Sequence, residues 1–420
     1  MFRNQSLSIV IGLMCLSLGT SDAWALDAAW RAETDARIKE IRQRDVQIRV
    51  VDAQGRSVPG AQVELKQTRQ AFPFGSAMGA TLLRNEKYRE FFKAHFNWAV
   101  FENETKWYSN ERQPGQDDYR RADAMVQWCR DNGIPVRGHC VFWAPEKWQM
   151  PWVRDLDEAE LRQAVQRRLD SVVRHFRGTF LHWDINNEML HGTFFKDGLG
   201  EDIHLWMFKR THELDPDAKL FVNEFNILSV DQDFNDVQVD EYVAHTQNLI
   251  DQGAPIHGVG IQGHIWYEDI RAHPEVLKAR LDKVAALGLP IWISEFDVAD
   301  DDEQSNADKL EIVYRTAYSH PSVEGIMMWV FWAGASWRGP NAGLAKRDWT
   351  LNDAGRRYEA LMDAWTTNTA GDTDTAGEFA GRGFFGDYVV TVTSATSPAI
   401  AQTFTLAPGS GTQVITVRTR

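Results

Sequence analysis

Residues 180–188 read FLHWDINNE, and residues 290–297 read PIWISEFD. Each is a short, nearly continuous apolar run that ends in carboxylates, as buried strands of a parallel sheet do at their exposed ends. Eight strand–helix units between residues 72 and 365 predict a closed α/β structure, the (β/α)8 TIM barrel, which takes roughly 250 residues. A doubly wound open sheet is the alternative. The other six runs are FPFGSAM from Phe72, WAVFE from Trp98, PVRGHCVFW from Pro135, LFVNEF from Leu220, HGVGIQGH from His257 and GIMMWVFW from Gly325.

Sequence typical of β-strands flanks the barrel on both sides. Residues 26–71 predict a short charged helix and then a hairpin of two alternating strands, VQIRVV from Val46 and AQVEL from Ala61. Residues 366–377, rich in Thr, Gly and Asp, predict a linker, and residues 378–420 predict further strands. A lone hairpin is marginally stable, and the C-terminal strands are too few to close a core. We therefore expect both segments to form one small accessory β-sandwich; separate docking on the barrel is the alternative.

Charge and the N-terminal segment limit the partners and the compartment. The 420 residues include 45 basic and 59 acidic ones, so the formal net charge is −14. This sign argues against nucleic acid and anionic membranes as partners and leaves neutral substrates open. Arg3, the short apolar run at 7–18 and the small residues at 23–25 predict a cleavable signal peptide over residues 1–25. We therefore expect a secreted or periplasmic protein, and we expect a monomer.

The cysteines indicate neither a disulfide framework nor a metal site. Cys15 lies in the predicted signal peptide, which leaves Cys129 in a helical pattern and Cys140 in a strand. We expect both to be small buried residues, although an oxidising compartment would permit a bridge. Their spacing matches no metal site, and we expect no metal and no cofactor.

Two glutamates follow strands on opposite sides of the expected barrel. Asn187-Glu188 ends the fourth strand and Glu295 ends the seventh. Catalytic groups of such barrels lie at the carboxyl ends of the strands. Two facing carboxylates suit glycosidic bond cleavage, in which one protonates the leaving oxygen and the other attacks the anomeric carbon or activates water. Each glutamate alone could be a solvated strand-end residue; the pair favours catalysis.

Neighbouring polar and aromatic residues strengthen this interpretation. Asp297 lies two positions after Glu295, and His264 closes the adjacent sixth strand. An imidazole between the two carboxylates would orient Glu295 and favour its ionised form. Polar groups beside tryptophans suit a sugar ring, whose hydroxyls need hydrogen bonds and whose C–H faces stack on indole. Such residues end the second, third and eighth strands: Glu102, Asn103, Lys106, His139, Trp143, Trp329 and Trp337.

Together these motifs resemble glycoside hydrolase family 10, the retaining endo-β-1,4-xylanases. The similar segments are WDINNE from Trp183, ENETKW from Glu102, GHCVFW from Gly138, GIQGH from Gly260, ISEFD from Ile293 and the pair Trp329 and Trp337. The flanking segments FPFG, GRGFFGDY and VVDAQGRSVPGAQVEL resemble the plant-type branch.

The resemblance implies a mechanism and a role for each residue. Glu188 would be the acid/base and Glu295 the nucleophile of a double displacement through a covalent glycosyl-enzyme, with xylan or a related neutral plant polysaccharide as the substrate. Asn187 would contact the 2-hydroxyl, and His264 and Asp297 would support the nucleophile. The substrate cleft would be lined by Glu102, Asn103, Lys106, His139, Trp143, Gln262, His264, Trp329 and Trp337.

The chain departs from the common family pattern at positions around this cleft, notably Ala144, Glu146, Phe225, Val330 and Ala333. None of them alters the two carboxylates, so the departures bear on tolerance of substrate side groups and on rate.

Two alternatives for the function stay open. One is another barrel β-glycanase, a cellulase or a mannanase. The other is a non-catalytic carbohydrate-binding barrel, against which the retention of both glutamates argues.

Overall fold

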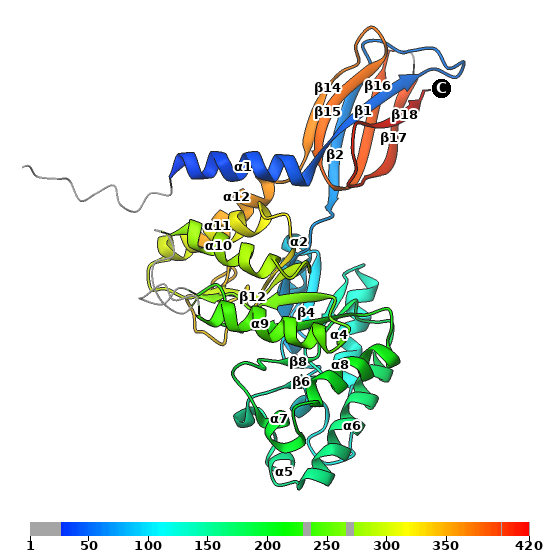
Figure 1. Ribbon diagram of the computed structural model, residues 1–420. Helices are drawn as coiled ribbons and strands as arrows, with labels where there is room; N and C mark the ends of the chain where they lie inside the picture. Colours follow the sequence, from blue (N-terminus) through cyan, green and yellow to red (C-terminus); the bar gives the residue numbers. More distant parts are fainter. Residues whose placement is uncertain (1–26, 230–236, 266–272, 396, 420) are drawn as a thin grey trace, which may run out of the picture.

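The computed structural model describes residues 27–229, 237–265, 273–395 and 397–419 (Figure 1). The signal peptide predicted at residues 1–25 lies outside them. Eight parallel strands form a closed barrel, because β10 pairs with both β9 and β12. The predicted barrel is therefore confirmed, and the open sheet is excluded. Its strands are β3 (Phe74–Met78), β4 (Trp98–Phe101), β5 (Val136–Gly138), β7 (His182–Asp184), β9 (Lys219–Glu224), β10 (Gly258–Ile261), β12 (Ile291–Val298) and β13 (Val323–Met328).

Amphipathic helices cover the barrel. The sequence sets the start of α6 (Glu158–His175), where Asp157 and Glu160 form a reciprocal capping box. Its apolar side, including Leu161, Val165 and Leu169, is buried in the main core. The other helices of eight or more residues around the barrel are α2 (Glu86–His95), α4 (Arg120–Asp131), α8 (Ile203–Leu214), α9 (Val237–Asp251), α10 (Pro274–Ala285), α11 (Glu303–Tyr318) and α12 (Asp353–Ala364).

Short elements lie in the loops that follow the barrel strands. They are η1 (Ala80–Leu83), α3 (Trp107–Asn110), β6 (Phe142–Trp143), η2 (Glu146–Trp148), α5 (Pro151–Arg154), β8 (Asn186–Asn187), α7 (Phe194–Leu199) and β11 (His264–Ile265). Cys129 and Cys140 are buried and unbridged. Among the helices that the structure describes, none has the length and apolar character to cross a bilayer.

Strands from both ends of the sequence build a second, smaller core beside the barrel (Figure 1). In one sheet, β1 (Gln43–Val51) lies between β15 (Glu378–Phe384) and β18 (Gln413–Arg418). The other sheet has the order β14 (Asn368–Asp372), β2 (Gln62–Gln70), β16 (Gly386–Ser394) and β17 (Ser397–Leu406). The barrel is inserted between β2 and β14. Alternate apolar residues of both sheets make up the core, among them Val46, Ile48, Val50, Val63, Leu65, Tyr388, Val390 and Val392.

Two expectations about these segments are wrong. β1 and β2 do not form a hairpin, because they lie in different sheets and each pairs with strands from the C-terminal segment. The predicted linker at 366–377 contains strand β14, whose residues 368–372 pair with β2. β14 is an edge strand of small and polar residues, so it lacks the apolar alternation that identifies a half-buried strand.

Helix α1 (Ala28–Arg42) docks on the barrel through a buried carboxylate. Glu311 of α11 accepts hydrogen bonds from Arg31 of α1 and from Arg315, with Nε–Oε1 distances of 2.7 Å in both cases, and it pairs with Arg357 of α12. Burial would raise the pKa of Glu311, but the three guanidinium groups lower it to about 2. The Glu311 carboxylate therefore links α1, α11 and α12 through ion pairs.

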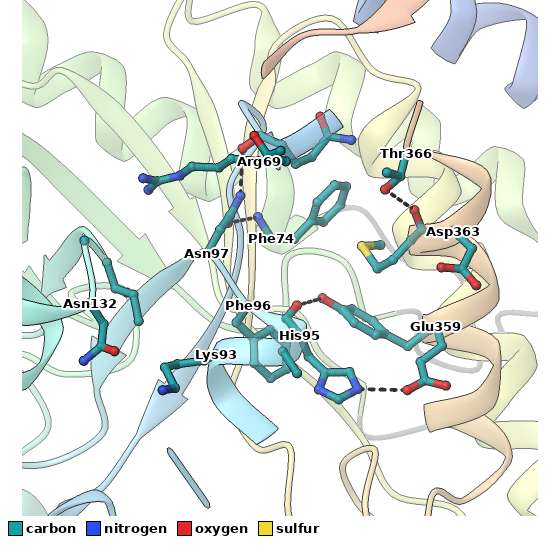
Figure 2. A pocket seen from close by; sticks show the side chains of 17 residues that line it. Arg69, Phe74, Lys93, His95, Phe96, Asn97, Asn132, Glu359, Asp363 and Thr366 are labelled. Atoms are coloured by element: carbon teal, nitrogen blue, oxygen red, sulfur yellow. Dashed lines mark hydrogen bonds and ion pairs between the residues drawn. The ribbon is translucent and has the colours of Figure 1, made fainter. Parts of the chain in front are cut away.

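A hollow of about 750 Å³ lies at the amino-terminal ends of the barrel strands (Figure 2). Phe74 begins β3 and Asn97 immediately precedes β4, and both line this hollow. On its α12 side, His95 Nε2 lies 3.0 Å from Glu359 Oε1. The hollow is therefore at the opposite end of the barrel from the strand-end glutamates.

Candidate active site

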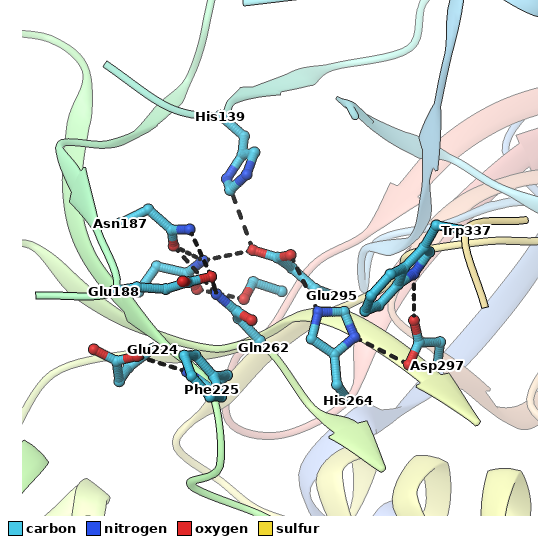
Figure 3. Close-up of polar contacts among 12 residues, drawn as sticks. His139, Asn187, Glu188, Glu224, Phe225, Gln262, His264, Glu295, Asp297 and Trp337 are labelled. Atoms are coloured by element: carbon cyan, nitrogen blue, oxygen red, sulfur yellow. Dashed lines mark hydrogen bonds and ion pairs between the residues drawn. The ribbon is translucent and has the colours of Figure 1, made fainter. Parts of the chain in front are cut away.

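Glu188 and Glu295 both lie at the carboxyl ends of barrel strands (Figure 3). Glu295 belongs to β12, while Glu188 directly follows β8 and has a φ of 64°. Its N–H donates to the Asn223 carbonyl at the end of β9, at 3.0 Å. Glu188 is 8% exposed and Glu295 is 4% exposed, so neither is a solvated strand-end residue.

Glu295 is surrounded by hydrogen-bond donors. Its Oε1 accepts from Asn223 Nδ2 at 2.7 Å and lies 3.8 Å from His139 Nδ1, and its Oε2 lies 3.4 Å from His264 Nε2. Burial alone would raise the pKa of Glu295, but the interactions with His139, His264 and Lys106 lower it to about 2. The carboxylate is therefore held ionised. From the sequence, His264 was expected to favour the ionised form of Glu295. His139 lowers the pKa of Glu295 as well.

His264 lies between two carboxylates (Figure 3). Its Nδ1 is 3.0 Å from Asp297 Oδ1, on the side away from Glu295. Burial lowers the pKa of His264, but Asp297 and Glu295 raise it to about 9. Asp297 is fixed in turn by Trp337 Nε1, which donates to Oδ2 at 2.9 Å, and by Arg338 Nη1, which donates to Oδ1 at 2.7 Å. The imidazole thus has a fixed orientation toward Glu295.

Glu188 is held by amides instead of charges. Gln262 Nε2 donates to Glu188 Oε1 at 3.0 Å, and Asn187 Nδ2 donates to the same oxygen at 3.3 Å. Asn223 Nδ2 donates to Asn187 Oδ1 at 2.9 Å as well as to Glu295. A chain of amide groups therefore links the two carboxylates and leaves them in different electrostatic surroundings.

A buried ion pair supports His139 from behind. His139 Nδ1 lies 2.8 Å from Asp184 Oδ2, and Arg137 pairs with the other oxygen of Asp184. All three side chains are about 1% exposed. Because Asp184 fixes the ring, His139 has a defined position beside Glu295 and against the edge of Trp329, whose ring centroid is 5.0 Å away.

The remaining predicted cleft residues come from neighbouring strand ends. Lys106 Nζ lies 4.4 Å from the ring centroid of Trp143 and 5.8 Å from that of Trp329. Burial raises the pKa of Glu102, against the influence of Lys106. Asn103 follows Glu102 and accepts from the Tyr108 hydroxyl at 2.6 Å. Trp337 is 47% exposed, as a platform open to a ligand requires.

The departure at Phe225 has a local explanation. The Phe225 ring stacks on His191 with centroids 3.7 Å apart. The adjacent Glu224 is buried and accepts from His191 Nδ1 at 2.7 Å and from the Leu190 N–H at 2.9 Å. Glu224 thereby fixes the loop that follows Glu188.

Sequence reasoning missed four residues of this site: Asn223, Arg137, Asp184 and Arg338. Asn223 ends an apolar run as Asn187 does, so its position at a strand end could have identified it as a site residue. Asp184 lies inside the WDINNE segment, but nothing in a single sequence pairs it with His139 and Arg137. Within the described ranges, no group of three or more His, Cys, Asp or Glu side chains is arranged to hold a metal ion.

Comparisons with known proteins agree with these motifs. Residues 64–360 match the model of Glycosyl hydrolase family 10. The chain is 49% identical over 389 residues to Anti-sigma-I factor RsgI6 of Acetivibrio thermocellus, covering 93% of this chain and 50% of that protein. It is 40% identical over 380 residues to Endo-1,4-beta-xylanase 1 of Arabidopsis thaliana, covering 90% of this chain and 39% of that protein. The chain thus spans half or less of the length of these two relatives.

Solved structures match the barrel. Xylanase 10B from Thermotoga petrophila, in complex with xylobiose, has a TM-score of 0.62 and 24% identity, covering 70% of this chain and 94% of that one. Identity at this level bears on the fold alone, and the fold agrees.

Proposed function

Since the chain belongs to glycosyl hydrolase family 10, we propose that it is a retaining endo-β-1,4-xylanase that cleaves the xylan backbone internally. The observation that best supports the proposal is the unequal environment of two buried carboxyl groups at one barrel mouth. Glu295 is held ionised by histidines and a lysine, whereas Glu188 contacts neutral amides. A nucleophile and a proton donor need such different surroundings.

The proposed reaction has two steps. Glu295 attacks the anomeric carbon while Glu188 gives its proton to the departing glycosidic oxygen, so that the C–O bond breaks as the ester bond to Glu295 forms. Glu188, now ionised, then takes a proton from water, and the hydroxide oxygen displaces Glu295 from the anomeric carbon. The product keeps the β configuration, and both glutamates return to their starting states.

Neighbouring residues would assist this chemistry. Asn187 would bind the 2-hydroxyl next to the reacting carbon, while Trp329 and Trp337 would provide aromatic surfaces for sugar rings. Glu102, Asn103, Lys106, His139 and Gln262 would complete the polar lining. Fixed donors around a carboxylate remove the need to reorganise solvent when charge moves, which is a large part of enzymatic rate acceleration.

The decisive experiment measures the release of reducing ends from xylan, cellulose and mannan in parallel. We expect activity on xylan, and proton NMR of the first products should show the β anomer before mutarotation. Preference for cellulose or mannan would assign another β-glycanase. Binding without release of reducing ends would identify a carbohydrate-binding barrel, and α products would contradict the retaining mechanism.

We also propose that the protein is exported, with cleavage near Ala25, and acts as a monomer. The basic start, short apolar run and small residues of positions 1–25 support export. N-terminal sequencing of protein from the culture medium or periplasm should begin close to residue 26, and light scattering should give the mass of one chain. Retention of Arg3 in the mature protein would contradict export by this signal.

A further inference from the structure

The turn that carries Glu188 has an unfavourable backbone conformation. Residues 188–191 form a turn in which the His191 N–H donates to the Glu188 carbonyl at 3.2 Å. Glu188 opens this turn with a φ of 64°, in the left-handed region, where the side chain of an L-residue crowds its own backbone. A residue stays in such a conformation only when its surroundings hold it there. The contacts of this turn therefore decide where the Glu188 carboxyl group lies.

Backbone hydrogen bonds hold the turn at its start. The Glu188 N–H donates to the Asn223 carbonyl at 3.0 Å, and the preceding Asn187 carbonyl accepts from the Ala144 N–H at 2.8 Å. These bonds fix the chain as it enters Glu188. The backbone dihedrals of Glu188 also depend on the direction in which the chain leaves it, so the far end of the turn needs an anchor of its own.

Glu224 is the anchor at the far end of the turn (Figure 3). Its side chain is buried, and each of its oxygens accepts from the turn: Oε2 from the Leu190 N–H at 2.9 Å, and Oε1 from His191 Nδ1 at 2.7 Å. Glu224 directly follows Asn223 on β9, so one stretch of this strand holds both ends of the turn. Hydrogen bonds to a carboxylate are among the strong ones, and two of them from successive residues fix the rotation of the turn as well as its position.

The His191 side chain is held from several other sides. Phe225 stacks on one face of the imidazole with centroids 3.7 Å apart, and Gln238 Nε2 of α9 lies 3.3 Å from the second ring nitrogen, Nε2. The next residue, Gly192, packs backbone to backbone on the loop after β6, because a Cβ there would lie 2.3 Å from the Pro145 nitrogen. Groups from β9, α9 and the loop after β6 therefore give the imidazole one orientation.

We propose that Glu224 and His191 are positioning residues for the proton transfer from Glu188. They act through the backbone of the turn, and by fixing it they hold the Glu188 carboxyl group against Gln262 and Asn187, where it faces the departing glycosidic oxygen. This inference rests on the proposed function, because it takes Glu188 as the acid/base. It adds that Glu224 and His191 contribute to the rate only as far as the leaving group needs a proton.

The test varies the need for that proton. Aryl β-xylobiosides with leaving groups from dinitrophenolate to unsubstituted phenolate depend increasingly on protonation as the C–O bond breaks. His191→Phe removes the hydrogen bond to Glu224 and keeps an aromatic ring against Phe225. Because a small misplacement of a catalytic group is costly, kcat/KM should fall about tenfold for phenyl xylobioside and less than about twofold for dinitrophenyl xylobioside. Steady-state kinetics across the series would measure this dependence on the leaving group.

Further variants separate positioning from a general loss of structure. His191→Asn restores an N–H donor near the place of Nδ1 and should recover most of the loss, while Glu224→Gln removes one accepting oxygen and should show the same dependence on the leaving group. The retained rate on dinitrophenyl xylobioside shows in each variant that the protein is folded. His175→Phe is the matched control, because His175 also stacks on an aromatic ring, Tyr119, and pairs with a carboxylate, Asp123, at 2.6 Å. It joins α6 to α4 and should change neither rate.

Two results would overturn the positioning role. Equal losses on phenyl and dinitrophenyl xylobioside in His191→Phe and Glu224→Gln would assign both residues to the stability of the fold alone. An unchanged rate on phenyl xylobioside in both variants would show that the turn holds Glu188 without them. Failure of the proposed function would differ from both results, because the unaltered protein would then release neither phenolate from the xylobiosides nor reducing ends from xylan.

Discussion

Glu295 at the barrel mouth and Glu311 on α11 are both buried carboxylates whose pKa is lowered to about 2, but different neighbours produce the effect. Three arginines from three helices surround Glu311, and their charges do not depend on pH in the range where the protein folds. Glu295 instead faces two histidines, a lysine and an amide. The arginines at Glu311 fix helices, whereas the groups around Glu295 keep a carboxylate ionised beside Glu188 at the barrel mouth.

A lowered carboxyl pKa does not by itself identify a catalytic residue. Whether such a carboxylate can react depends on which residues hold it. Guanidinium groups that bond bidentately or from several sides fully occupy the oxygens of a carboxylate, as they do at Glu311. Histidine and amide partners at Glu295 leave it able to form a new bond.

The largest expected effect is the loss of turnover when Glu295 is removed. Glu295→Ala and Glu295→Gln should each lower kcat on xylan by at least about 10⁴-fold, because no other group can form the glycosyl-enzyme. Reducing-end assays on purified, folded protein would measure this. Glu311→Gln serves as the control, since it also removes a buried carboxylate but should keep kcat. If kcat fell by a comparable factor in the Glu295 variants and in Glu311→Gln, the two carboxylates would not differ in function as described.

Removing the proton donor should give a smaller loss that depends on the substrate. Glu188→Ala should lower kcat/KM on xylan about 10³-fold, within the range for general acid catalysis. An aryl xylobioside with a dinitrophenolate leaving group needs no proton, so its kcat/KM should fall by less than about tenfold. Steady-state kinetics on both substrates would decide, and equal losses would argue against Glu188 as the acid.

Glu311→Gln should act on stability. Removing the carboxylate leaves three guanidinium groups without their shared partner, at a cost of about 3 kcal/mol in the free energy of unfolding. Urea denaturation at pH 7 would measure it. Because the folded pKa of Glu311 is lowered, the stabilisation is complete above its unfolded pKa, about 4.5, and is lost as the pH falls through about 2. The variant and the unaltered protein should therefore converge at acidic pH, and a constant gap would contradict the assignment.

The smallest effect concerns the pH profile. His264→Ala removes a cation beside Glu295, so the pKa of Glu295 should rise and the acidic limb of kcat/KM should move up by about one pH unit. His95→Ala, at the opposite end of the barrel, is the matched control and should leave that limb in place. Since the folded pKa of His264 is raised to about 9, the stability it provides is complete below about pH 6.5 and is lost as the pH rises through 9. An unmoved acidic limb in His264→Ala would show that His264 does not influence the nucleophile.

The sequence predicted the barrel well because each of its strands is buried on both faces. Such strands are short, continuous apolar runs, as in IWIS before Glu295, and they need no knowledge of distant residues. The accessory strands were harder. β14 has no apolar pattern that would identify it as a strand. β1 pairs with strands more than 300 residues away, so neither propensity nor spacing could show that β1 and β2 lie in different sheets.

In the candidate site, too, the sequence predicted residues with a local pattern and missed those whose partners are distant in the chain. Glu188 and Glu295 stand out because each breaks an apolar run at its end. Asn223 bonds to Glu295 and to Asn187, which bonds to Glu188, but it was quoted only as part of the LFVNEF run. The ion pair of Arg137 with Asp184 and the contact of Arg338 with Asp297 join residues from different strands. Such contacts depend on barrel closure and side-chain rotamers, which a single sequence does not encode in any local pattern.

The split sandwich also determines the order in which the chain can fold as it leaves the ribosome. β1 emerges early, yet its partner β18 follows about 360 residues later, a delay of roughly 20 to 70 seconds at typical synthesis rates. The whole barrel is made in that interval, and α1 can already dock on it through Glu311. The barrel can thus fold before the flanking domain is complete, because β1 and β2 lack their partner strands until the last part of the chain has been made.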